Sequence, residues 1–413
     1  MQLKKITLLI SKILFISTLS HSVNSCEEKN FWQTWYKDNQ FKGFGIVPNK
    51  KDIAQAQYLF AENHYEGKKL SKDYSRALDL YTKASDSGVN QANFKLGLMN
   101  HYGKGKVKNL KLAYEYYIKS ANNNPESQFN LGLMNRYGIG TKKDLKNAFY
   151  WFSQAAQKQI IYDSNNCRKN INGIVEAQFN LAQMNHYGLG TDKNIIKAAK
   201  WYERAANNGM KEAQFNVAKL LFSGEGLEYD INRSIEYYLL AANQGLLEAQ
   251  FNLAQIYHYG PNEVRNYDEA KDLYIKAGEQ GMQEAFFNLG LMAHYGRGTT
   301  QNYVSAKQFY LLSMSDSIPE TFLNLGFLYH YGLGTPVDNK KAYKYFKKAA
   351  YKNIAQAQYH LGILFRDGKG VIQNSKEAKY WFKKSNIRVT DETKNIQNDL
   401  ALKEPEDVHL YVK

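Results

Sequence analysis

Imidazole side chains recur along the chain in one local setting, and theirs is the first chemistry to consider. Five of the nine histidines stand directly before a Tyr-Gly pair, namely His101, His186, His258, His294 and His330. Neutral imidazole binds metal ions and acts as a general base near pH 7. The chain has no His-Glu-x-x-His sequence, the spacing with which one helix presents two zinc ligands and a base. The histidines therefore need another explanation.

The chain also lacks the common sequence motifs of nucleophilic catalysis and phosphate binding. No serine begins a Ser-x-x-Lys sequence, and neither a Gly-x-Ser-x-Gly elbow nor a phosphate loop ending in Gly-Lys-Ser/Thr occurs. Two cysteines, Cys26 and Cys167, are too few for a disulfide framework or a zinc site. An enzyme would have to assemble its nucleophile and base from distant segments. We expect a non-enzymatic protein without cofactors.

Glycines at regular intervals show how the histidines are positioned. A glycine stands at 67, 103, 138, 188, 224, 260, 296, 332 and 368, with spacings of 36, 35, 50, 36, 36, 36, 36 and 36 residues. Nine copies of one repeat therefore fill residues 54–388. The single long spacing places an insertion at about 160–174, which contains Cys167.

Two helices alternate within each repeat. Before the marker glycine, small residues lie at −11 and Gly or Ala at −6, with an apolar residue at −7. After it, Ala lies at +10, or Ser in the case of Ser234, and an aromatic pair usually lies at +13 and +14. These spacings place apolar residues on one face of each helix. We expect helix A, a glycine turn that stops it with positive φ, and then helix B. The Gly or Ala at −6 allows close helix packing.

This pattern, complete in residues 177–209, resembles the Sel1-like repeat, a relative of the tetratricopeptide repeat. The resemblance implies an all-α fold, a right-handed α-solenoid of about nine repeats whose concave face is lined by helix A. Asn100, Asn135 and Asn185 depart from the family, which often has Tyr three residues before the glycine.

By analogy with the tetratricopeptide helix, positions −9, −5, −2 and −1 face the concave groove. The predicted partner-binding residues are Phe179, Phe215, Phe251, Phe287, His186, His258, His294, His330, Tyr187, Tyr259, Tyr295 and Tyr331. Aromatic residues favour interface hot spots. The alternative is structural: the phenylalanines form core between repeats, and the histidines stabilise helix C-termini. The regular asparagines at −8 are expected to satisfy neighbouring backbone groups.

A metal site is not expected at these histidines. Packed helices lie about 8–10 Å apart, whereas zinc–nitrogen bonds are about 2.0–2.1 Å long. Histidines one repeat apart would struggle to share one ion.

The ends of the chain indicate export. Residues 1–25 resemble a signal peptide, with Lys4 and Lys5 before an apolar stretch that is too short to span a bilayer. Cys26 would then be the first mature residue, and it is either a lipidation site or a disulfide partner of Cys167. Residues 26–53 form an aromatic N-terminal capping segment, and residues 389–413 a C-terminal cap and tail. The insertion is either a partner-binding element or a tolerated loop.

Charge limits the class of partner. The formal net charge is +15, or +12 without residues 1–25, and no run of five basic residues occurs. We expect this charge to be spread over all repeats, to favour acidic protein partners and not to bind nucleic acid.

These expectations combine into an exported protein-interaction scaffold, located in the periplasm, on the outer membrane or outside the cell, with a role in host interaction or virulence. The resemblance also leaves two alternatives. One is an envelope enzyme acting on β-lactam or cell-wall substrates, and the other is a eukaryotic lumenal quality-control adaptor.

Overall fold

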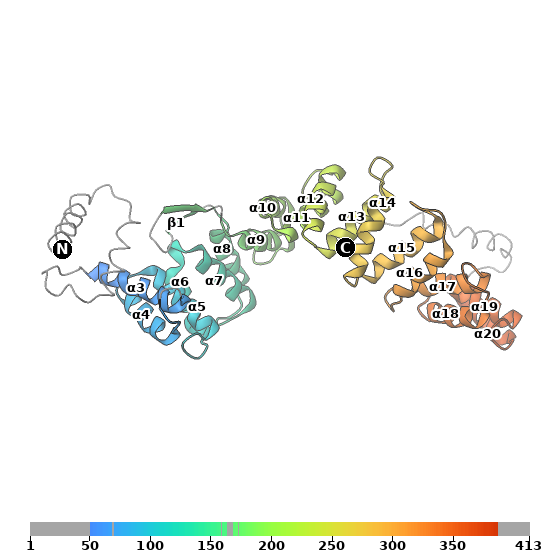
Figure 1. Ribbon diagram of the computed structural model, residues 1–413, viewed down its shortest axis with the longest axis horizontal. Helices are drawn as coiled ribbons and strands as arrows, with labels where there is room; N and C mark the ends of the chain where they lie inside the picture. The colour runs from blue at the N-terminus through green and yellow to red at the C-terminus, as the bar shows by residue number, and fades with distance from the viewer. Residues whose placement is uncertain (1–49, 68–69, 158, 163–167, 172, 387–413) are drawn as a thin grey trace, which may run out of the picture. The chain divides into compact units, whose positions relative to one another are not determined.

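The computed structural model describes residues 50–67, 70–157, 159–162, 168–171 and 173–386 (Figure 1). In this part the chain forms 18 α-helices, α3 to α20, which divide between a first unit up to Asn208 and a second unit from Gly209. The predicted signal peptide, Cys26, Cys167 and the segment 389–413 lie outside the described residues. So does the predicted N-terminal capping segment, apart from the start of α3.

The first unit contains four helix pairs. Their bounds are α3 Lys50–Glu66, α4 Tyr74–Asp86, α5 Asn90–Tyr102, α6 Leu110–Ser120, α7 Pro125–Tyr137, α8 Leu145–Ala155, α9 Val175–Tyr187 and α10 Ile195–Asn207, with a short 3-10 helix, η2, at Ala121–Asn123. Odd-numbered α-helices are helix A and even-numbered ones helix B.

The second unit contains five helix pairs of the same kind. Their bounds are α11 Lys211–Ser223, α12 Ile231–Asn243, α13 Leu247–Tyr259, α14 Tyr267–Glu279, α15 Gln283–Tyr295, α16 Tyr303–Leu312, α17 Pro319–Tyr331, α18 Asn339–Tyr351, α19 Ala355–Asp367 and α20 Ser375–Ser385. The helix-pair prediction is confirmed.

Two local signals fix the helix ends. Helix A stops at a left-handed glycine, as at Gly188 with φ 70°, whereas Gly260, which precedes Pro261, is extended. Six residues after each marker glycine, an Asp or Asn side chain caps helix B, as when Asn194 accepts the backbone N–H of Lys197. This cap satisfies one of the donors that a helix start leaves free.

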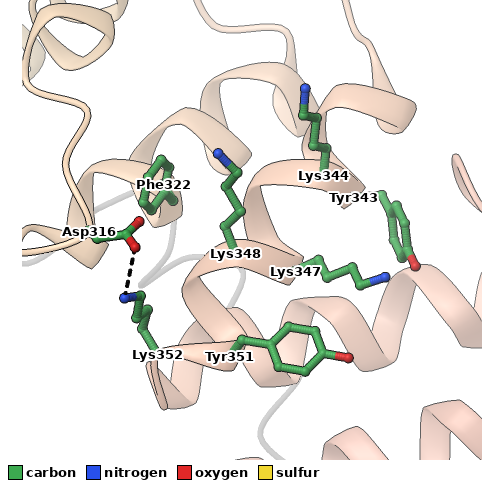
Figure 2. A pocket seen from close by; sticks show the side chains of 8 residues that line it. All are labelled: Asp316, Phe322, Tyr343, Lys344, Lys347, Lys348, Tyr351 and Lys352. Carbon is green, nitrogen blue, oxygen red and sulfur yellow. Dashed lines mark ion pairs between the residues drawn. The ribbon is translucent and has the colours of Figure 1, made fainter.

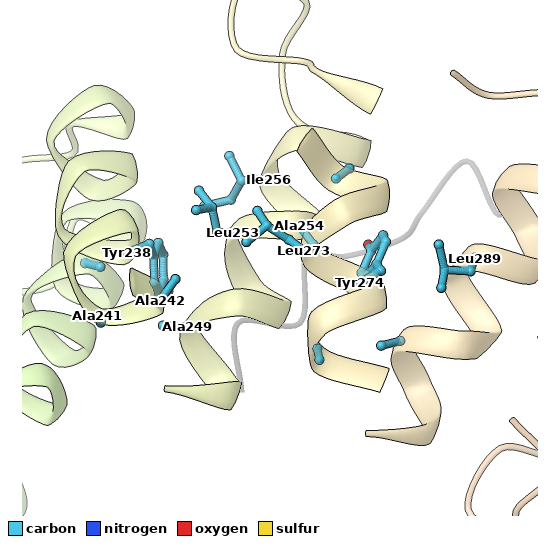
Figure 3. Close-up of a cluster of buried hydrophobic side chains, with 14 of the residues drawn as sticks. Tyr238, Ala241, Ala242, Ala249, Leu253, Ala254, Ile256, Leu273, Tyr274 and Leu289 are labelled. Carbon is cyan, nitrogen blue, oxygen red and sulfur yellow. The ribbon is translucent and has the colours of Figure 1, made fainter. Parts of the chain in front are cut away.

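The core of each repeat is an aromatic ring from helix B, at +14. A Cβ atom on Gly97 would lie 2.5 Å from the Tyr117 ring, so the glycine at −6 makes room for the ring. Tyr238 and Tyr274 are the equivalent rings of α12 and α14, and both are fully buried. Leu253 of α13 lies between them (Figure 3). Burial of these rings explains why each helix pair packs closely.

The insertion differs from the helix pairs on either side of it. Its described residues form two short antiparallel strands, β1 Gln159–Tyr162 and β2 Arg168–Ile171, paired from Gln159 with Ile171 to Tyr162 with Arg168. The repeat spacing locates the insertion but carries no information on its internal structure. No helix of the described residues is long and apolar enough to cross a membrane.

Candidate partner-binding groove

The phenylalanines at −9 pack against the helix B ring of their own repeat. Phe179, Phe215, Phe251 and Phe287 are half-buried. Ring centroids are 5.6 Å apart for Phe179–Tyr202, and 5.8, 5.8 and 5.9 Å for Phe215–Tyr238, Phe251–Tyr274 and Phe287–Tyr310. One side of each phenylalanine ring is therefore used by the core.

The histidines at −2, near the C-terminal end of helix A, contact the same helix B rings. His186 and His330 are half-buried, but His258 and His294 are buried. The burial of the last two imidazoles fits the structural alternative, and partner binding by these histidines stays a prediction. Each buried imidazole has a ring contact that His186 lacks, with the first residue of helix B: His258 lies 5.9 Å from Tyr267, and His294 lies 5.0 Å from Tyr303.

Burial also keeps these two imidazoles neutral. It lowers the pKa of His258 to about 3, with the cationic side chains of Arg297 and Arg265 adding to the effect. Burial alone lowers the pKa of His294 to about 4. Both lie below the ordinary value because a buried charge is poorly solvated.

The asparagines at −8 bond to backbone of their own helix. Asn180 Nδ2 donates to the Glu176 carbonyl at 2.7 Å, and Asn130, Asn216 and Asn288 repeat this bond to the residue four positions earlier. The prediction that they satisfy backbone groups is confirmed at these positions. In two of them the side-chain oxygen accepts a hydrogen bond from the preceding repeat: Asn180 from Arg136, and Asn288 from Tyr259 Oη at 2.9 Å.

The tyrosines at −1 differ in solvent exposure between the two units. Tyr102, Tyr137 and Tyr187 of the first unit are exposed by 63%, 60% and 63%. Tyr259, Tyr295 and Tyr331 of the second unit are half-buried. Each exposed ring lies beside the preceding side chain: His101 stacks on Tyr102 at 4.8 Å, His186 stacks on Tyr187 at 4.6 Å, and the Arg136 guanidinium lies 5.5 Å from the Tyr137 ring centre.

Polar contacts join successive repeats beside these rings in the first unit. Arg136 donates to Asn180 and, at 3.1 Å, to Gln183 of the next repeat. Lys95 forms an ion pair with Glu62 of the preceding repeat at 2.9 Å, with both side chains largely shielded from solvent. These contacts hold successive helix A elements of the first unit together.

Spacing alone does not separate exposed tyrosines from half-buried ones, but the residue two positions earlier does. Asn100, Asn135 and Asn185 precede the exposed rings. All three are buried, and each amide donates to a carbonyl of its own helix at 2.7 or 2.8 Å. Tyr257, Ala293 and Tyr329 occupy this position in the second unit.

Among the residues that the structure describes, no group of three or more His, Cys, Asp or Glu side chains could hold a metal ion.

The repeat geometry agrees with a family model. The model for the Sel1 repeat matches residues 54–89, 90–124, 125–159, 175–210, 211–246, 247–282, 283–313, 323–354 and 355–386. The chain belongs to the Sel1 repeat family. The matches leave out residues 160–174, where the inserted hairpin lies.

Solved structures of Sel1 repeat proteins share this fold. One is c5321, a protective antigen of uropathogenic Escherichia coli with 26% identity and a TM-score of 0.71, covering 88% of this chain and 79% of that one. Another is a Sel1 repeat protein from Oxalobacter formigenes, with 22% identity and a TM-score of 0.53, covering 85% and 93%. A search of curated proteins finds no match.

Sel1 repeats mediate protein–protein interaction, and proteins built from them are generally scaffolds.

Proposed function

We propose that this chain is an exported interaction scaffold of the bacterial envelope, and that the first unit binds an extended segment of a partner protein. The observation that carries the proposal is the row of exposed tyrosines at equivalent positions of consecutive repeats, Tyr102, Tyr137 and Tyr187. Tyrosine provides a large contact area at low entropic cost, and interface hot spots are enriched in it. We refer to these three residues as the tyrosine row.

Location and biological setting belong to the same proposal. The apolar stretch after Lys4 and Lys5 supports export to the periplasm, the outer membrane or the exterior. Lipidation at Cys26 would anchor the scaffold. The similarity to a protective antigen of a uropathogen supports a role in host interaction.

Affinity capture with matched variants tests the scaffold role. Tagged wild-type chain should retain a specific partner from envelope extracts, and replacing the tyrosine row by serine should reduce recovery at least tenfold. The control replaces three exposed apolar residues of helix B in the same unit, Ile118, Tyr150 and Ile196, by alanine. Equal recovery from both triple variants would contradict the proposal.

An envelope enzyme is the competing class of function. Nitrocefin turnover by the purified chain, abolished by a groove substitution, would support that class instead.

A further inference from the structure

Charge is unevenly distributed within the second unit. Residues 323–386 carry twelve lysines and arginines and three acids, a formal net charge of +9, whereas residues 211–313 carry eight basic and twelve acidic residues, a net charge of −4. The expectation of an even spread is therefore wrong. The positive charge gathers on α18, which carries five lysines, and on α20, which carries four, whereas α17 carries none.

Helix α18 presents three lysines without an acidic partner. In the described part of the chain, no carboxylate lies within ion-pairing distance of Lys344, Lys347 or Lys348, although all three are exposed. Nearby acids are already engaged: Asp338 pairs with Lys341 at 3.3 Å, and Asp316 with Lys352 at 3.3 Å. The local repulsion between these lysines would be relieved by an anionic ligand.

The three lysines line a hollow of about 480 Å³ together with three aromatic rings and the Asp316–Lys352 ion pair (Figure 2). Tyr343, Lys347 and Tyr351 form one row along α18, and Lys344, Lys348 and Lys352 form a second. The Lys348 ammonium lies 4.9 Å from the ring centre of Phe322, and the Lys347 ammonium lies 5.6 Å from Tyr343 and 6.0 Å from Tyr351. The rings supply apolar contact area between the charges.

The spacing of the lysine row selects the form of the ligand. Residues four apart on a helix are separated by about 6 Å along its axis, and alternate residues of an extended chain by about 6.6 Å. Carboxylates at alternate positions of an extended peptide would therefore meet Lys344 and Lys348 in turn, whereas Lys352, the third lysine of the row, is paired with Asp316. Side chains of the intervening residues would face Tyr343 and Tyr351.

We propose that this hollow on α18 binds an extended acidic segment of a partner protein, with carboxylates at alternate positions and apolar or aromatic residues between them. A concave surface with two narrow parallel rows fits one peptide chain better than a flat bilayer. This inference rests on the proposed scaffold role, but it uses the second unit and not the tyrosine row.

Fluorescence anisotropy with a labelled peptide tests the inference on the full chain in 150 mM salt. The probe is Gly-Ser-Glu-Tyr-Glu-Tyr-Glu-Ser-Gly, and its isomer Gly-Ser-Glu-Glu-Glu-Tyr-Tyr-Ser-Gly has the same charge with the acids adjacent. We expect saturable binding of the probe, at least tenfold tighter than that of the isomer. The double variant K344E/K348E should lose binding at least tenfold, and K344Q/K348Q should lose part of it.

The matched control is K376E/K379E, which reverses two exposed lysines on α20 and changes the net charge equally. It should retain binding within about threefold. Equal loss in both reversed variants, or equal affinity for the isomer, would overturn the inference. Tighter binding of phosphatidylglycerol vesicles or of a single-stranded oligonucleotide, sensitive to K344E/K348E, would overturn it in favour of those ligands.

The two proposals fail separately. Replacing the tyrosine row by serine should leave peptide binding unchanged, and K344E/K348E should leave capture through the tyrosine row unchanged. Loss of one result with retention of the other identifies which surface is wrongly assigned.

Discussion

The two units use the same aromatic motif in opposite ways. In the first unit, Tyr137 and Tyr187 display their rings to solvent, whereas in the second unit Tyr259 is half-buried and donates a hydrogen bond to Asn288 of the next repeat. The preceding histidines differ too, since His258 and His294 are buried in the second unit. A recurring motif therefore makes a contact between repeats in the second unit and leaves its rings exposed in the first.

Acid should distinguish the units most strongly. Both buried histidines have a pKa lowered by burial, to about 3 for His258 and about 4 for His294. Below the unfolded-state value of about 6.5, only the unfolded chain takes up these protons, so stability present above that pH is lost as the pH falls. At pH 5 we expect each histidine to cost the second unit about 2 kcal/mol.

Native-state hydrogen exchange, corrected for intrinsic rates at pH 7 and pH 5, resolves this loss by helix. Opening free energies of α13 and α15 should fall with acid, and the double variant His258→Phe/His294→Phe should show a much smaller fall. Unchanged opening free energies in these two wild-type helices would contradict the assigned burial.

Removing a tyrosine ring should also lower the free energy of unfolding by different amounts in the two units. We expect Tyr259→Ala to lower the free energy of unfolding by about 2–3 kcal/mol, because a packed ring and a hydrogen bond between repeats are lost. Tyr187→Ala, at an exposed position, should cost less than about 0.5 kcal/mol. Urea unfolding monitored by circular dichroism measures both. Similar losses would remove the distinction between a stabilising ring and a displayed one.

His258→Phe should have a smaller effect at pH 7, an increase in stability. Neither ring nitrogen of His258 has a hydrogen-bond partner among the described residues. An apolar ring of similar shape removes the cost of burying them, so stability should rise by about 1 kcal/mol. Thermal unfolding checks the sign, and a decrease would show that the nitrogens are bonded after all.

The helix caps should show no difference between the units. Asn194 caps α10 in the first unit and Asn266 caps α14 in the second, each accepting a backbone N–H of its own helix. We expect Asn194→Ala and Asn266→Ala each to cost about 1 kcal/mol in urea unfolding. Unequal costs would mean that the units differ in their scaffold as well as in their tyrosines.

Repeat spacing predicts most of the fold because its causes are local. Helix periodicity, the left-handed glycine at 188 and the small residue at 97 all act within one helix pair. The capping residues at +6, such as Asn194, are equally regular and add a signal that the helix pattern alone does not use.

Depth, by contrast, depends on the residue at +7, at the start of helix B. Spacing places His258 and His186 on the same helix face, but the Tyr267 ring contacts only His258, since Ile195 stands at the equivalent position of the other repeat. The total charge likewise hides the difference between the acidic and basic parts of the second unit. The hairpin of the insertion lies outside the repeat pattern, so the pattern does not predict it.

Site-resolved photo-crosslinking in the native cell tests the central claim most directly. Benzoylphenylalanine is placed singly at the six equivalent tyrosine positions, 102, 137, 187, 259, 295 and 331. We predict adducts with one protein of constant mass at the first three positions and none at the last three. Adducts confined to the second unit, or equal at all six positions, would contradict the account.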